Sequence, residues 1–133
     1  AQALLAIAKK AVAAGVSILK PGVPIRDVNE AILQTIRDEG ATPGHTVGHG
    51  MGADLSDGMP ILPNSPFLVP ENMVITLHPN VLGEMDGVFY GDTYLVRADG
   101  VENLTAGYND SNILEDMLSA LRANAGESCQ SAI

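Results

Sequence analysis

The sequence has few basic residues, and this shortage excludes two classes of partner. Lys and Arg number 7 against 16 Asp and Glu, which gives the 133-residue chain a formal net charge of -9. Nucleic acids and anionic membranes are bound through positive patches, and the largest Lys/Arg cluster here is the pair Lys9-Lys10. We therefore expect no nucleic acid and no membrane among the partners.

The sequence also has a single cysteine and no uninterrupted apolar run of membrane length. Cys129 cannot form a disulfide within the chain, which fits a reducing compartment. The apolar stretch over residues 1–19 is interrupted by Lys9 and Lys10 and is too short and too charged to cross a bilayer. It also lacks the charged leader of a signal peptide. We therefore expect a soluble helix at this end and a cytoplasmic protein.

Two helices are predicted in the first 40 residues. Apolar residues recur every three or four positions before the break at Pro21-Gly22, which predicts the first helix. A second helix is expected to start at Pro24, where the missing N–H costs nothing, and to end at Gly40. The two stripes consist of Leu5, Ala8, Val12, Val16 and Leu19, then of Ile25, Val28, Ile32 and Ile36.

Glycine and proline are frequent over residues 41–70, which predicts loops with short extended pieces. Residues 73–79 predict a strand with Thr76 and His78 on one face and Ile75 and Leu77 on the other. Residues 88–96 predict a second strand that ends in a turn at 98–100. Residues 109–124 open with capping residues and predict a third helix. We expect one domain over residues 1–123 and a polar tail over 124–133.

The stretch GHTVGHGMG, residues 44–52, sets His45 and His49 among four glycines. In extended backbone the two histidines would share a face roughly 13 Å apart, so they could bind one metal only if the glycines let the chain curl. His49 is the stronger candidate for a site, because Gly48 and Gly50 allow a ligand or another segment to approach closely. A turn that needs positive φ at these glycines explains the pattern equally, and both interpretations stay open.

Four blocks of the sequence together carry a resemblance to a known family: KPGVPIRDVNEAI, GHTVGHGMGADLSD, PENMVITLHPN and GVFYGDTYLVRADGVENLT. They resemble the second half of the pita-bread domain of the creatinase/aminopeptidase family, which includes methionine aminopeptidase, Xaa-Pro aminopeptidase, prolidase and creatinase. The resemblance covers nearly all of residues 1–107 and implies an α+β fold, with helices packed on a curved antiparallel sheet and the site on its concave face. It also implies that the chain is a fragment of a longer gene product, and that this product is a homodimer.

The resemblance also assigns the site, and there the sequence departs from the family. The family's metallopeptidases hold two metal ions with two aspartates from the first half, then a histidine and two glutamates from the second. His49 matches the ligand histidine, and His45 matches a further histidine four residues earlier. The two glutamates fall at His78 and Gly91, and a further peptidase histidine falls at Ser56. Without the bridging carboxylates a two-metal centre is not expected, because two divalent ions close together repel.

Two kinds of catalytic site then remain open. A single divalent ion (Zn, Mn or Fe) could be held by His49, His78 and Asp92. Strand alternation points Asp92 away from the face of Gly91, so Asp92 would turn inward only if Gly91 marks a bulge. Without any cofactor, His49 and His78 could act as acid and base, with His45 and Ser56 as further candidates. We expect a divergent hydrolase that cleaves an amide, amidine or peptide-like C–N bond in a small molecule or short peptide. The alternative is a non-catalytic binding or scaffold module that has kept the fold.

Overall fold

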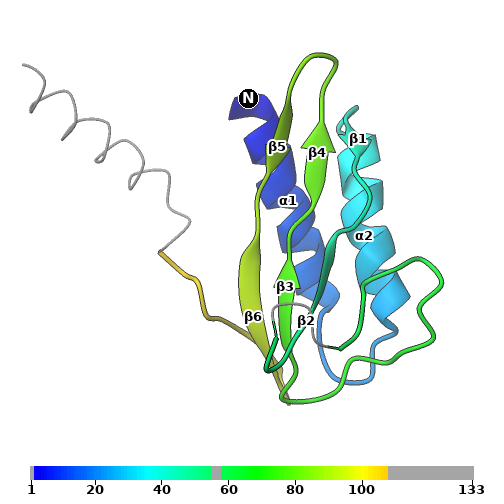
Figure 1. Cartoon of the computed structure of the whole chain (residues 1–133), viewed down its shortest axis with the longest axis vertical. Helices are drawn as coiled ribbons and strands as arrows, with labels where there is room; N and C mark the ends of the chain where they lie inside the picture. Colours follow the sequence, from blue (N-terminus) through cyan, green and yellow to red (C-terminus); the bar gives the residue numbers. More distant parts are fainter. Residues whose placement is uncertain (1, 55–57, 108–133) are drawn as a thin grey trace, which may run out of the picture.

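The computed structural model describes residues 2–54 and 58–107, which form one layer of helices and one of antiparallel strands (Figure 1). Both predicted helices are confirmed, as α1 (Gln2–Ile18) and α2 (Ile25–Asp38). Their apolar stripes face the core, where Ala8, Ile25 and Ile32 are fully buried. The two helices pack closely at Gly15, because a Cβ there would lie 2.8 Å from two side-chain atoms of Ile32.

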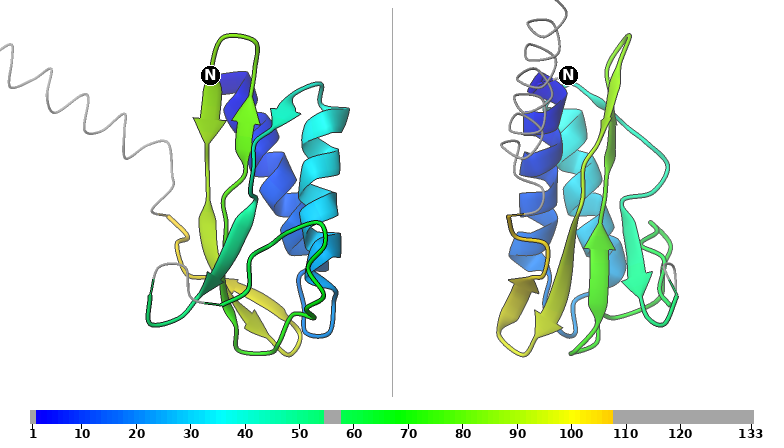
Figure 2. Two further views of the ribbon diagram at one scale, coloured as in Figure 1. Left: turned by 45° about the vertical axis from the view of Figure 1, so that its right-hand side comes forward. Right: turned by 60° about the vertical axis from the view of Figure 1, so that its left-hand side comes forward.

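The strands form two sheets, which lie on one side of the helix layer in both views of Figure 2. One sheet has the order β1-β4-β5, with β1 at Thr42–Pro43, β4 at Asn80–Leu82 and β5 at Gly87–Phe89. The other has the order β2-β3-β6-β7, with β2 at Gly48–Met51, β3 at Val74–Leu77, β6 at Asp92–Arg97 and β7 at Gly100–Asn103. All pairings are antiparallel, so the α+β expectation is confirmed.

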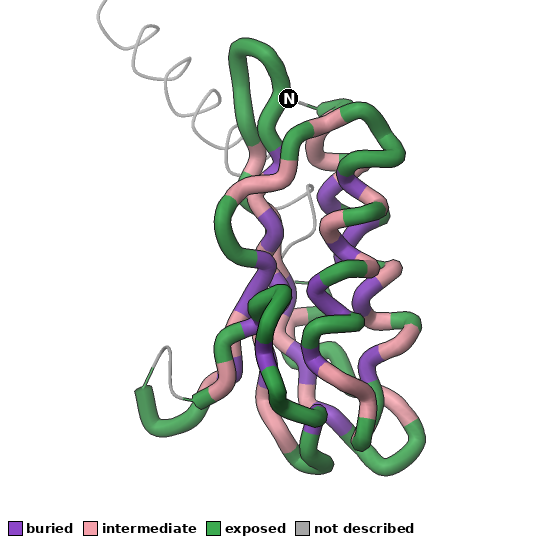
Figure 3. The backbone as a smooth tube through the Cα atoms, turned by 90° about the vertical axis from the view of Figure 1, so that its right-hand side faces the viewer, coloured by how far each residue is buried: buried purple, intermediate pink, exposed green. Residues whose placement is uncertain are grey.

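Alternation along β3 decides which side of the larger sheet faces the helices. Ile75 and Leu77 are fully buried and belong to the core that the helices share, whereas Thr76 and His78 lie on the other face and are only partly buried. This is the alternation that the sequence predicts. Figure 3 shows buried stretches on both the helices and the strands, as expected for a core between two layers.

The single strand predicted over residues 88–96 is wrong, because the chain forms two strands there, β5 and β6, with a break at Tyr90 and Gly91. The opposite strand breaks at the same level, between β3 and β4. The physical reason is close approach: a Cβ at Gly91 would lie 2.7 Å from the Cβ of His78 and 2.9 Å from the Leu77 carbonyl oxygen. The four strands thus form one long two-stranded ribbon that is interrupted where Gly91 meets His78.

The remaining predictions concern the loop region, the shorter strands and the C-terminal residues. The loop region over residues 41–70 contains β1 and β2 as its short extended pieces, and β4 and β7 were not predicted. The third helix and the polar tail lie outside the described residues. Within the described part of the chain, neither helix combines the length and apolar character needed to span a bilayer.

Candidate functional site

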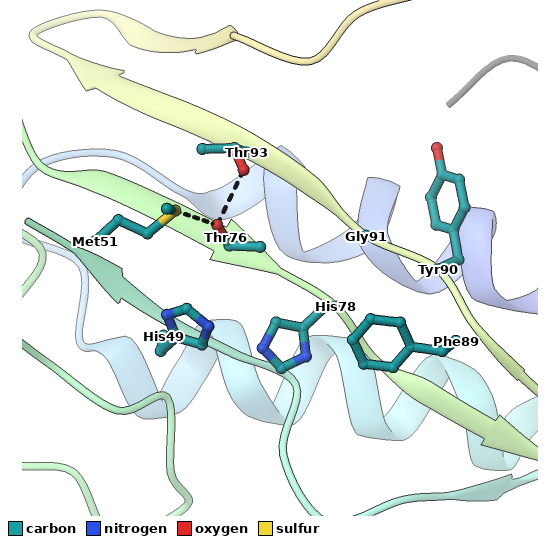
Figure 4. Close-up of a pocket in the computed structure, with 8 residues that line it drawn as sticks. All are labelled: His49, Met51, Thr76, His78, Phe89, Tyr90, Gly91 and Thr93. Atoms are coloured by element: carbon teal, nitrogen blue, oxygen red, sulfur yellow. Dashed lines mark hydrogen bonds between the residues drawn. The ribbon is translucent and has the colours of Figure 1, made fainter. Parts of the chain in front are cut away.

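A pocket of about 470 Å³ opens on the face of the larger sheet that points away from α1 and α2 (Figure 4). Its walls come from β2, from β3 and the residue after it, and from the end of β5 through the junction to the start of β6. Because β3 pairs with both β2 and β6, the sheet itself brings these segments side by side. The lining residues are His49, Met51, Thr76, His78, Phe89, Tyr90, Gly91 and Thr93.

Backbone contacts fix both histidines in the wall. Gly48 has a φ of +155°, and a Cβ there would lie 2.1 Å from the Thr76 carbonyl oxygen, so the residue before His49 must be glycine. The Gly50 N–H donates to the Met59 carbonyl at 2.9 Å, which ties the outer edge of β2 to the following loop. The His78 N–H donates to the Val47 carbonyl at 2.7 Å, so the residue just before β2 also sets the position of the second histidine.

The two imidazoles are neighbours. The ring centroids of His49 and His78 lie 5.0 Å apart with an angle of 59° between the planes, and the Phe89 ring lies 5.1 Å from that of His78. The His49 Nδ1 lies 3.0 Å from the Gly50 carbonyl oxygen. Since a carbonyl only accepts, Nδ1 carries the hydrogen, and the lone pair of His49 is on Nε2.

His78 is adapted to remain uncharged. Burial lowers its pKa below the ordinary value of 6.5, a hydrogen bond to its own backbone opposes this, and the nearby His49 lowers the pKa further. Its Nδ1 is buried and, apart from that contact with its own backbone, has no hydrogen-bond partner among the described residues. A neutral imidazole with an unsatisfied nitrogen is suited to exchange a hydrogen bond or a proton with a bound molecule.

Two threonines form the polar floor beside the histidines. The Thr76 hydroxyl donates to the Met51 sulfur at 2.8 Å and lies 2.9 Å from the Thr93 hydroxyl. Because the single hydrogen of Thr76 is used on Met51, Thr93 is the donor in the second bond. These hydroxyls therefore satisfy one another, and the imidazoles are left as the groups able to transfer protons near neutral pH.

The structure separates the other residues that the sequence nominates. His45 is exposed and does not line the pocket. Asp92 is buried on the opposite side of β6, where it accepts hydrogen bonds from Tyr90 at 2.9 Å and Thr105 at 2.7 Å. The predicted ligand set of His49, His78 and Asp92 is therefore not assembled, since Asp92 follows the strand alternation to the other face. Ser56 lies outside the described residues.

Sequence reasoning also missed residues of the pocket. Thr76 could have been found, because it shares a strand face with His78, and Thr93 lies directly opposite it in the β3–β6 pairing. Met51 and Phe89 carried no local signal. They reach the pocket through the pairing of β2 with β3 and through the break between β5 and β6.

The fold and the histidine wall together define a protein of the pita-bread peptidase class. The chain belongs to metallopeptidase family M24, whose profile it matches over residues 1–98. It is similar to an uncharacterized peptidase of Staphylococcus aureus strain MW2, at 29% identity over 108 residues that cover 79% of this chain and 31% of the relative. The expected kinship with peptidases is thus confirmed, and the chain spans about a third of the length of such relatives.

Solved structures agree with this assignment. The X-Pro aminopeptidase of Thermotoga maritima superposes with a TM-score of 0.76 at 26% identity, over 82% of this chain and 32% of that one. The prolidase of Pyrococcus furiosus superposes with a TM-score of 0.71 at 27% identity, over 78% and 32% of the two chains. The described residues therefore correspond to part of a larger pita-bread domain.

The residues present do not fit a pair of metal ions. The three positions that match the family's second-half ligands, His49, His78 and Gly91, all line this one pocket. However, two of them carry an imidazole and a hydrogen in place of the bridging carboxylates, and the described residues of the lining include no Asp or Glu. Across residues 2–54 and 58–107, no group of three or more His, Cys, Asp or Glu side chains is arranged to hold a metal. Neutral ligands alone do not offset the repulsion between two divalent ions.

Proposed function

We propose that the full-length protein hydrolyses an amide, amidine or peptide-like C–N bond by proton transfer at His49, with His78 as a hydrogen-bond donor, and without the two-metal centre of its relatives. One observation carries this proposal: the two imidazoles lie with ring centroids 5.0 Å apart in a pocket whose described lining has no carboxylate. The similarity to an X-Pro aminopeptidase and a prolidase supports a small peptide or peptide-like substrate.

Each histidine has a distinct role in this proposal. The Nε2 lone pair of His49 accepts a proton from water while the water oxygen bonds to the substrate carbon. The C–N bond then breaks, and the His49 imidazolium returns that proton to the leaving nitrogen, so that one water molecule is consumed. His78, which is neutral, donates a hydrogen bond to the oxygen or nitrogen on which negative charge develops.

The size and lining of the pocket suit a small substrate. Its volume of about 470 Å³ lies within the range of ordinary ligand sites. Met51 and Phe89 supply apolar walls, while the two histidines and two threonines supply a few converging polar groups. This combination favours a short peptide or amide over a long polymer.

The test uses the full-length protein, its metal content by plasma mass spectrometry, and hydrolysis of Xaa-Pro dipeptides and simple amides. We expect hydrolysis that persists after chelation. It should fall at least about 100-fold in His49→Gln, because general acid–base catalysis contributes that much. His45→Gln is the matched control, since His45 is exposed and lies outside the pocket.

Two results would contradict the proposal. About one equivalent of metal that is lost in His49→Ala, together with loss of activity on chelation, would establish a single-metal hydrolase. A folded protein that hydrolyses none of the substrates would establish the non-catalytic binding module, for which the missing carboxylates are the structural argument.

A further inference from the structure

A second pocket, of about 390 Å³, lies beside the first and is bordered by three of the five methionines of the chain. We name it the methionine pocket, and we call the pocket lined by His49 and His78 the histidine pocket. The two pockets share Met51. Among the described residues of the methionine pocket's lining, Glu71 is the one that carries a charge. The lining residues are Gly50, Met51, Gly58, Met59, Pro70, Glu71, Asn72, Met73 and Val74.

The two pockets form one surface along the sheet. His49 pairs with Thr76 and Met51 pairs with Val74, so all four side chains lie on the same face. The polar pair borders the histidine pocket and Val74 borders the methionine pocket, so the face changes from polar to apolar within two residues. The hydrogen bond from the Thr76 hydroxyl to the Met51 sulfur, 2.8 Å long, holds Met51 at this boundary.

The walls of the methionine pocket are partly fixed and partly adaptable. Met59 and Met73 are partly buried and pack against the hydrophobic core, so the core supports them from behind. Methionine is unbranched and polarizable, and it adjusts to apolar groups of different shape. The Glu71 carboxylate repels a negatively charged group, although its exposure weakens the effect.

We propose that the methionine pocket receives an unbranched, uncharged apolar side chain of the substrate whose C–N bond lies at His49 and His78. The assignment rests on the proposed function in that the occupant belongs to the molecule that is cleaved. Binding at Met51 and Met59 nevertheless does not require turnover. Met51 lines both pockets, so it lies between the group that is cleaved and the side chain that is bound.

The direct test is a titration of the full-length protein, labelled at its methionine methyl groups with ¹³C, with norleucinamide and with glycinamide. Norleucinamide should shift the methyl signals of Met51 and Met59, whereas glycinamide, which has no side chain, should leave Met59 unchanged. The methyl signal of Met85, which is 96% exposed on the β4–β5 connection, serves as the internal control. Identical responses to both amides, or no response at Met59, would overturn the proposal.

A variant gives an independent measurement. Met59→Phe fills the pocket and should weaken norleucinamide binding at least about tenfold, the usual size of an apolar side-chain contribution, without changing glycinamide binding. Met85→Phe is the matched control. Methyl shifts without any hydrolysis would keep the methionine pocket and reject the proposed function. Hydrolysis that is indifferent to side-chain length, with no shift at Met59, would reject the pocket and keep the hydrolase.

Discussion

At the scale of single residues, the chemistry of the pocket depends on the close approach of two imidazoles, those of His49 and His78. Both are held by backbone contacts, through the Gly50 carbonyl for His49 and the Val47 carbonyl for His78. Burial and the neighbouring ring both act against a positive charge on His78. His78 is therefore disposed to stay neutral, which is the form in which the proposed function has it donate a hydrogen bond.

Replacing His49 should change the titration of its neighbour. In His49→Gln the pKa of His78 should rise, because the positive charge that opposes its protonation is removed while the burial remains. At any pH near that pKa, a smaller fraction of His78 would then be neutral. The measurement is an NMR pH titration of the His78 ring protons. His45→Gln should leave the titration unchanged, and an unchanged pKa in His49→Gln would show that the rings do not interact.

Asp92 should act in structure and not in metal binding. Burial is the largest cause that raises the pKa of Tyr90 to about 12, and a hydrogen bond to Asp92 and its charge add to this. In Asp92→Asn the pKa of Tyr90 should fall, without reaching 10 because burial persists. Ultraviolet titration of the phenolates measures the shift. The metal content should equal that of the unchanged protein, and a loss of bound metal would reinstate Asp92 as a ligand.

At the scale of elements, the sequence predicted the helices and strands that have a local pattern, but not the features that depend on pairing between distant strands. The stripe from Ile25 to Ile36 and the alternation around Thr76 are short-range signals, and both are found in the structure. β7 was missed because GVEN has little strand character and is extended only through its pairing with β6. The break at Gly91 was missed because its cause, His78, lies on another strand.

In the candidate site, too, residues with a local signal could be predicted, whereas those placed by strand geometry could not. His49 and His78 could be nominated from the sequence, by their glycine neighbours and by the resemblance. Asp92 was nominated only on the condition that Gly91 marks a bulge, an irregularity that would reverse the alternation of β6. The structure instead keeps that alternation, with Asp92, Tyr94 and Val96 buried in turn. The break at Tyr90 and Gly91 separates β5 from β6 but does not change the side of the sheet that Asp92 faces.

The tight passage of β2 past β3 should tolerate no side chain at Gly48. In Gly48→Ala the new Cβ would lie 2.1 Å from the Thr76 carbonyl oxygen, so we expect a loss of at least about 2 kcal/mol of unfolding free energy. Gly100→Ala is a matched control, since Gly100 has nearly the same φ, +157° against +155°, but has nothing within 4 Å. Urea unfolding measures both. Equal losses would assign the cost to backbone strain alone.

At the scale of the whole described molecule, the two sheets differ in how far their apolar side chains are exposed. Ile75 and Leu77 of the larger sheet are fully buried, whereas Leu82, Met85 and Phe89 of the smaller sheet and its connection are exposed. The connection between β4 and β5 extends past the ends of the helices in Figure 1. Fewer buried contacts mean a lower free energy of local opening.

Hydrogen exchange should resolve this difference. Amides of β3, which is paired on both sides within the larger sheet, should exchange most slowly, and those of β4 and β5 should exchange earlier. Mass spectrometry of exchanged peptides from the full-length protein measures both classes. If the amides of β4 and β5 were as protected as those of β3, then the exposed apolar side chains of the connection would have to be covered in the intact protein.

The interrupted ribbon also has a mechanical consequence. The chain passes between the two sheets three times, at residues 44–47, 78–79 and 90–91, and His78, Tyr90 and Gly91 are themselves parts of the pocket wall. A change in the angle between the sheets must therefore alter the distance across the pocket. A displacement of the exposed end of the smaller sheet, around Met85, would be transmitted along the ribbon to His78 and would change its distance from His49.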